Sequence, residues 1–257
     1  MIINHNIAAL NTHRQLSTAT NAQSKNMEKL SSGLRINRAG DDAAGLSVSE
    51  KMRSQLRGLE QASRNSQDGI SYLQTAEGAL NEVSAMATRL KELAVQKANG
   101  TYNTEDIANI DLEMNALGDE INNIIDTTEF NGKNVFTSAI DITVTEDASV
   151  KLNIAAATLT STAALTSAST VAEIDAAIDE VNLQRATYGS QQNRLEHTIN
   201  NLNTTNENLT ASESRIRDVD MAKEIMQQTK NSILSQASQA MLAQANQQPQ
   251  GVLQLLR

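Results

Sequence analysis

The stretch LEQASRNSQDGISYLQTAEGALNEVSAMATRLKELA, residues 59–94, carries small and apolar side chains at steps of three and four. This spacing puts them on one face of an α-helix and is typical of a coiled-coil seam. Gly58, Gly69 and Gly78 interrupt the helix at about 1 kcal/mol each, and their missing side chains leave room for another helix to approach. The seam positions are Leu59, Ser63, Ser66, Ile70, Leu73, Ala76, Leu80, Val83, Ala87, Leu90 and Ala94.

Two more seams follow along the chain. Asn99-Gly100 ends the first helix, and a second begins after a Thr104 cap, with Glu105 and Asp106 in the first turn, where the helix dipole favours anions. The second seam is Ile107, Ile110, Met114, Leu117, Ile121 and Ile124, and the third runs from Val171 through Ile174, Ile178, Val181, Arg185, Tyr188, Gln192, Leu195, Ile199, Leu202 and Asn206 to Leu209. The middle of the chain is therefore predicted to be a bundle of long helices.

Between the second and third helices the period changes to two. Ile140, Ile142 and Val144 alternate with polar residues, and the alternation resumes at 150–154 after the turn at 146–149, which predicts a β-hairpin near residues 139–155. Phe130-Asn131-Gly132 marks the turn that leads in. Residues 155–170 are almost entirely Ala, Ser, Thr and Leu, so we expect a connecting segment there.

The two ends of the chain are amphipathic and poor in helix breakers. Their apolar stripes need partners, and we expect both ends to be helical only when they pack against each other and against neighbouring copies. The residues expected to pack between subunits are Ile3, Ile7, Leu10, Met27, Leu30, Leu34, Val219, Met226, Ile233, Ala237, Met241 and Leu242.

Composition excludes several classes of protein. The 257 residues include two Phe, three Tyr and no Trp, which argues against a bulky aromatic core. A net charge of -9, without a basic stretch or a stacking platform, argues against nucleic-acid binding. No cysteine is present, so disulfides and thiolate metal sites are excluded. The start shows neither a basic leader nor an apolar core of a signal peptide, and no stretch is apolar enough for membrane insertion.

Candidate chemistry favours a structural interpretation. His5, His13 and His197 form no metal-ligand motif, and no serine lies in a nucleophile elbow. Asp41 and Asp42 are adjacent and flanked by glycines, which predicts a turn followed by a helix cap rather than an acid and base pair. We therefore expect no catalysis, cofactor or metal.

Several motifs at the two ends closely resemble those of bacterial flagellin. The amino-terminal ones are NHNIAALN at residues 4–11, KLSSGLRIN at 29–37 and AGDDAAGL at 39–46. The carboxy-terminal ones are SRIRDVDMA at 214–222 and the run from Ile233 to Gln250. The likeness covers roughly residues 1–136 and 176–257. Longer flagellins insert outer domains between these parts, and this sequence resembles the minimal members that lack them.

The resemblance implies a mainly α fold: an elongated antiparallel coiled-coil or helical-bundle rod, residues 41–213, with a small β-hairpin. Residues 1–40 and 214–257 would pair as a terminal coiled coil lining the filament channel. The function implied is that of a non-enzymatic subunit that polymerises into the flagellar filament used for swimming. The family is exported unfolded through the type III apparatus, so the resemblance implies a secreted, extracellular protein.

The same resemblance implies partners. These are other copies of the chain, a hook-filament junction protein, a filament cap protein and a flagellin export chaperone that binds the carboxy-terminal stretch. Residues 89–96, RLKELAVQ, resemble the Toll-like receptor 5 binding segment of flagellins, with Glu113 at the accompanying acidic position. Arg89 and Leu93 are one turn apart and off the seam, so we expect both to face outward as receptor contacts. An inter-subunit contact is the alternative for this segment.

Two other functions share some of these features. A hook-filament junction protein would carry the same terminal signatures, and a coiled-coil scaffold or signalling protein would carry similar helical seams. Elongation from filament fragments separates the three, because only a filament subunit adds copies without limit.

Overall fold

The computed structural model describes the backbone of residues 6–255 and the side chains of residues 6–248. The chain forms two compact units, which we name by their residues. The end unit comprises Met1–Ser54 and Asn208–Arg257, and the bundle unit comprises Gln55–Glu207. The end unit therefore also contains residues 41–54 and 208–213, which the resemblance assigns to the rod. These residues include the start of one long helix and the last turns of another.

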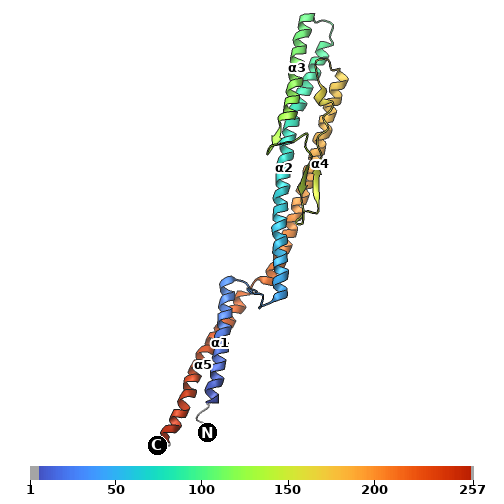
Figure 1. Ribbon diagram of the computed structural model, residues 1–257. Coiled ribbons are helices and arrows are strands. Elements are labelled where there is room, and N and C mark those ends of the chain that lie inside the picture. The colour runs from blue at the N-terminus through green and yellow to red at the C-terminus, as the bar shows by residue number, and fades with distance from the viewer. Residues whose placement is uncertain (1–5, 256–257) are drawn as a thin grey trace. The chain divides into compact units, whose positions relative to one another are not determined.

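The bundle unit is built from parts of α2 (Ala43–Lys97) and α4 (Val171–Arg217) together with α3 (Thr104–Thr127). These helices lie side by side in Figure 1 and contribute to one apolar core. Most seam positions expected from the sequence are buried, which confirms the helical bundle. The fully buried larger side chains include Leu73, Leu80, Leu90, Met114, Ile121, Ile174 and Leu195.

Two small antiparallel sheets accompany the helices. β3 (Ile140–Thr143) pairs with β4 (Lys151–Ile154), with Ile142 opposite Leu152, which confirms the predicted hairpin. The sequence missed a shorter pair, β1 (Glu129–Phe130) and β2 (Lys133–Asn134), joined through Asn131 and Gly132 at φ 52 and 74. Both turn residues have positive φ, which suits a two-residue hairpin turn.

Two glycines of α2 lie against the β3–β4 hairpin. A Cβ at Gly58 would lie 2.6 Å from the Cβ of Glu146, and one at Gly69 would overlap Ile142. At Gly78 no atom lies within 4 Å of the built Cβ. The predicted approach of another helix is therefore wrong at Gly58, where the hairpin approaches instead, and at Gly78. At Gly69 the hairpin is joined by Leu195 of α4, whose Cδ1 would lie 3.3 Å from the added Cβ.

The segment between β4 and α4 packs against the bundle. It contains a short 3₁₀ helix, η1 (Thr162–Ala164), and buries Leu159, Thr162 and Leu165. The Glu180 carboxylate on α4 accepts backbone N–H groups of residues 160, 161 and 162 at 2.9, 2.9 and 3.1 Å. One side chain thus satisfies three successive backbone amides of this connector, and Lys97 and Asn115 bond to the backbone of Ser167 further along it.

The end unit pairs α1 (Ile7–Ser32) with α5 (Met221–Leu255), which lie side by side in Figure 1. Asn6 caps α1, because its Oδ1 accepts the Ala9 N–H at 3.0 Å. Gly33 ends α1 in the left-handed region at φ 72, where glycine is favoured. The pairing of the terminal helices agrees with the predicted fold class.

Candidate subunit interface

Hydrogen bonds join the two chain segments where α1 and α4 end. The Arg35 N–H donates to the Arg217 carbonyl at 2.7 Å, and the Val219 N–H donates to the Gly33 carbonyl at 3.0 Å. These two bonds flank an antiparallel bridge between Leu34 and Asp218. Both segments are therefore fixed to each other within the end unit before α5 begins.

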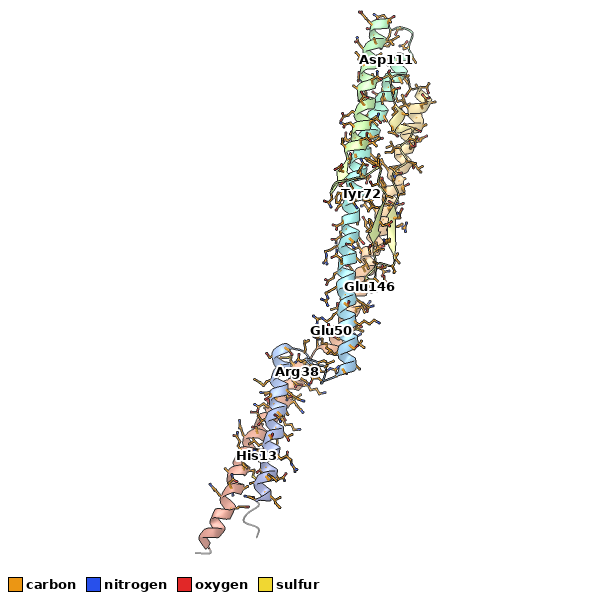
Figure 2. The ribbon with its side chains drawn as sticks, viewed as in Figure 1. His13, Arg38, Glu50, Tyr72, Asp111 and Glu146 are labelled. Atoms are coloured by element: carbon orange, nitrogen blue, oxygen red, sulfur yellow. The ribbon has the colours of Figure 1, made fainter. Side chains whose placement is uncertain are left out.

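Glu50 on the first turns of α2, labelled in Figure 2, reinforces this junction. Its Oε1 lies 2.7 Å from Nη1 of Arg217, and this hydrogen bond is the main reason that the pKa of Glu50 is below its usual value. Asp41 and Asp42 have the structural roles predicted for them. Asp41 accepts the Arg38 N–H at 3.0 Å, which lowers its pKa, and Asp42 accepts the Gly45 N–H at 2.8 Å as the cap of α2.

The contact between α1 and α5 is made mainly by small and polar side chains. Ala19 and Asn26 of α1 are buried, as are Asn231 and Ala245 of α5. Leu16 and Leu242, which are larger, are only half-buried. The two helices therefore pair within the chain without using most of their large apolar side chains.

Those large side chains face outward instead. Six of the residues expected to pack between subunits expose more than half of their surface, and we call them the exposed apolar set. They are Ile7 at 70%, Leu10 at 73%, Met27 at 54%, Met226 at 67%, Ile233 at 61% and Met241 at 59%.

The remaining residues predicted for this role differ in exposure. Leu30, Leu34, Val219 and Leu242 are half-buried, Ala237 is exposed, and Ile3 lies outside the described residues. Sequence reasoning missed Ile225 and Leu234, which are exposed and line a shallow apolar depression on α5 together with Met226, Thr229, Lys230 and Ile233. Ile225 and Ile233 are eight residues apart, as are Met226 and Leu234, and this separation, which keeps two side chains near one face of a helix, was the signal available.

The expected receptor contacts are only partly exposed. Arg89 donates to Glu113 at 3.0 Å and to Glu92 at 2.9 Å, and the bond to Glu92, followed by that to Glu113, raises the pKa of the guanidinium. The predicted outward orientation of Leu93 is wrong: this side chain is 2% exposed and belongs to the bundle core. α2 forms ion pairs with α3 through Arg89 and with α4 through Lys91 and Asp175, so positions beside the seam are also covered.

The residue that caps α3 differs from the one predicted from the sequence. The cap of α3 is Asn103 rather than Thr104, since Asn103 Oδ1 accepts the Asp106 N–H at 2.8 Å. Asp106 Oδ2 in turn accepts the Asn103 N–H at 3.3 Å, which completes a capping box.

The described residues contain no cluster of three or more His, Asp or Glu side chains arranged to hold a metal ion. Over the same part of the chain, no helix combines the length and apolar content needed to cross a bilayer. Long paired helices with an outward-facing apolar set define the class as a helical structural protein.

Comparison with known proteins identifies the family. The model of the bacterial flagellin N-terminal helical region matches residues 3–140, and that of the C-terminal helical region matches residues 171–256. The chain belongs to the bacterial flagellin family. It is a structural subunit that polymerises with other copies of itself into the flagellar filament, and it is not an enzyme.

Relatives match over the whole chain. The chain is 54% identical to flagellin of Bacillus subtilis (strain 168) and 53% identical to flagellin of Halalkalibacterium halodurans, with all of each chain covered. It is 48% identical to the flagellar filament 33 kDa core protein of Treponema phagedenis, again over all of both chains. The crystal structure of Bacillus cereus flagellin is 35% identical, with a TM-score of 0.50, and covers 54% of this chain and 88% of that one.

Proposed function

We propose that neighbouring copies cover the exposed apolar set in the filament. The observation that carries this proposal is the outward orientation of large aliphatic and thioether side chains on two helices that already pair with each other. Fully burying each such side chain contributes about 1.5–3 kcal/mol, so contact between copies supplies stabilisation that the single chain lacks. The end helices are accordingly marginal in the free chain and become protected in the assembly.

The same proposal assigns a layer to each part of the chain. Residues 1–40 and 214–257 form the inner coiled coil around the filament channel, and residues 41–213 form the surrounding layer. The support is the resemblance of the terminal motifs to the flagellin family and the pairing of α1 with α5.

Partners and location follow from the same family. The chain is exported unfolded by the type III apparatus, adds to an extracellular filament beneath a cap protein and meets a junction protein at the hook. Before export, a chaperone covers the apolar depression on α5 formed by Ile225, Met226, Ile233 and Leu234. A partner with an apolar helical groove fits this surface, because exposed aliphatic side chains recur along one helix.

Seeded elongation tests the proposal. Fragments of wild-type filament are incubated with monomer, and growth is followed by electron microscopy. The double substitution Met226→Ser/Ile233→Ser is expected to stop elongation while leaving the thermal unfolding of the bundle unit unchanged. Gln227→Ser on the same helix is the matched control and should elongate at the wild-type rate, because Gln227 is polar and exposed.

Elongation by the double variant at the wild-type rate would overturn the role of the exposed apolar set. The same assay separates the two other functions, since rings or short caps on the seeds would indicate a junction protein and soluble oligomers a scaffold protein.

Receptor recognition is a second proposed function. The exposed Arg89 and Glu113 pair supports it, since a charged pair on adjacent helices offers a defined polar contact. Because Leu93 is buried, it supports the helix surface from below rather than contacting the receptor. Arg89→Ala is expected to weaken Toll-like receptor 5 signalling with little change in unfolding temperature, whereas Leu93→Ala should lower both. Unchanged signalling by Arg89→Ala would contradict this proposal.

A further inference from the structure

The contact between α1 and α5 contains a buried polar network formed by Asn26, Glu224, Gln228 and Asn231. Asn26 and Asn231 are 7% and 8% exposed, although both carry polar amides. In the amide orientation assigned from its partners, Asn26 Nδ2 donates to Glu224 Oε1 at 3.0 Å and to the Ala22 carbonyl at 3.1 Å. Its Oδ1 accepts from Asn231 Nδ2 at 3.1 Å and from the Gln228 N–H at 3.3 Å. Every polar atom of the Asn26 side chain is thus satisfied by this arrangement.

Other fixed points in the same contact are also polar. At the amino-terminal end of α1, Asn6 Nδ2 donates to the Ala245 carbonyl at 2.7 Å. Just beyond its carboxy-terminal end lies the backbone bridge between Leu34 and Asp218. The network of Asn26 lies between these points, so hydrogen bonds mark the antiparallel alignment along α1.

The side chains between those points give little directional packing. The buried apolar side chains, Ala19 and Ala245, are small, the serines at 235 and 238 are half-buried, and the larger Leu16, Leu30 and Leu242 are only half-buried. Contacts between small side chains change little when one helix rotates or shifts against the other. A buried amide differs in this respect, because losing its partner costs about 1–3 kcal/mol. Single buried asparagines specify register in coiled coils by this means.

We propose that the Asn26 and Asn231 pair specifies how α1 aligns with α5 within one chain, separately from the exposed apolar set that specifies contact between chains. This inference rests on the proposed function, because alignment decides which apolar side chains of the two helices are presented together. The large apolar residues remain free for neighbouring copies because polar groups align the pair. Ile233, two residues after Asn231, illustrates the division: it is 61% exposed while Asn231 is buried.

Disulfide trapping in the full-length chain tests the proposal, since the chain has no native cysteine. Interpolation between the fixed points places Leu16 opposite about Ser238. Leu16→Cys/Ser238→Cys therefore reports native alignment. The same interpolation places Leu10 opposite about Leu242, so Leu10→Cys/Leu234→Cys, on exposed positions about eight residues out of alignment, reports unspecific encounter. The rate of intrachain disulfide formation is measured in the monomer under a fixed oxidant, and elongation of seeds is measured separately.

Adding Asn26→Ala/Asn231→Ala is expected to slow trapping by the inner reporter pair roughly tenfold. Gln23→Ala, a half-buried polar truncation on the same helix, should change the rate little. Met226→Ser/Ile233→Ser should leave trapping unchanged while stopping elongation.

Three results would overturn the inference: unchanged trapping in the asparagine variant, equal slowing by Met226→Ser/Ile233→Ser, or inner-pair trapping no faster than that of the exposed pair in the wild-type background. Failure of the wild-type chain to elongate seeds would instead contradict the proposed function. The two failures are therefore distinguishable.

Discussion

The bundle unit and the end unit use their apolar residues in opposite ways. The bundle unit buries its large side chains in one core, whereas the end unit leaves Ile7, Leu10 and Ile233 mostly exposed. Their charges also differ. The end unit carries 12 Lys and Arg against 8 Asp and Glu, a net charge of +4, and the bundle unit carries 9 against 22, a net charge of -13. The bundle unit covers its own large apolar side chains, whereas the end unit leaves its own exposed for contact with other copies.

The largest expected effect concerns the core of the bundle unit. Leu80→Ala, at a fully buried position, should lower the free energy of unfolding by about 2–5 kcal/mol, because it removes packed methyl groups and leaves a cavity. Ile233→Ala in the end unit should leave that free energy nearly unchanged and slow filament elongation instead. Chemical denaturation of the monomer, followed by circular dichroism, measures the first quantity. Similar destabilisation by both substitutions would break the comparison between the units.

Two glycines within the bundle unit sharpen the comparison further. A Cβ at Gly118 would lie 2.5 Å from the Leu165 carbonyl oxygen, so Gly118→Ala should destabilise the unit by about 1–3 kcal/mol. Gly78→Ala is the matched control, since no atom lies within 4 Å and alanine favours the helix by about 1 kcal/mol. Thermal unfolding should therefore shift in opposite directions for the two variants. A shift in the same direction would contradict the packing of the connector on α3.

Tyr72, labelled in Figure 2, links pH to the stability of the bundle unit. Its hydroxyl donates to the Val135 carbonyl at 3.0 Å, and burial raises its pKa to about 12. An unfolded tyrosine titrates near pH 10, so between pH 10 and 12 the folded chain keeps a proton that the unfolded chain loses. Stability should therefore fall as pH rises through this window.

Tyr72→Phe should remove much of that pH dependence. At neutral pH it should cost about 1–3 kcal/mol, because the buried Val135 carbonyl loses its partner. Tyr102→Phe provides the control, since its half-exposed hydroxyl can be replaced by water. Urea unfolding at pH 8 and pH 11 measures both effects. If the free energy of unfolding falls equally between these pH values in wild type and Tyr72→Phe, Tyr72 is not the source of the pH dependence.

The smallest expected effect concerns salt. Bundle units of net charge -13 repel when copies come together, and raising salt from about 0.01 M to about 0.15 M shortens the screening length from about 30 Å to about 8 Å. Seeded elongation should therefore accelerate modestly over this range. The effect should shrink when Asp119 and Glu120, both exposed on α3, are changed to Asn and Gln. A rate independent of salt would remove the electrostatic difference between the units.

Periodicity predicted the elements well and their partners less well. The seam through Leu80 and Leu90, the hairpin at Ile142 and the turn and cap at Asp41 and Asp42 follow from local spacing, and the structure contains them. A stripe on a helix does not reveal which of its residues contact a partner in the same chain. The pairing of α1 with α5 was therefore predicted, but the small and polar residues that make the contact were not. Leu93 was misplaced because α2 has neighbours on two sides and a single seam describes only one.

The polar determinants were the least predictable from sequence. Asn26 and Asn231 are separated by most of the chain, and nothing in their local sequence marks them as buried partners. The role of Glu180 could not be predicted from sequence either, because it depends on the backbone of residues 160–162 lying close to α4.

The bonds that Glu180 makes also affect how the chain meets proteolytic enzymes. A stretch rich in Ser, Thr and Ala would ordinarily be an easy place to cut, because proteases act on segments that can detach and extend. Here three successive backbone amides donate hydrogen bonds to the Glu180 carboxylate. This segment must therefore detach from α4 before it can enter the active-site cleft of a protease. Resistance to digestion in this connector thus depends on a neighbouring helix, and Glu180→Gln is expected to weaken it.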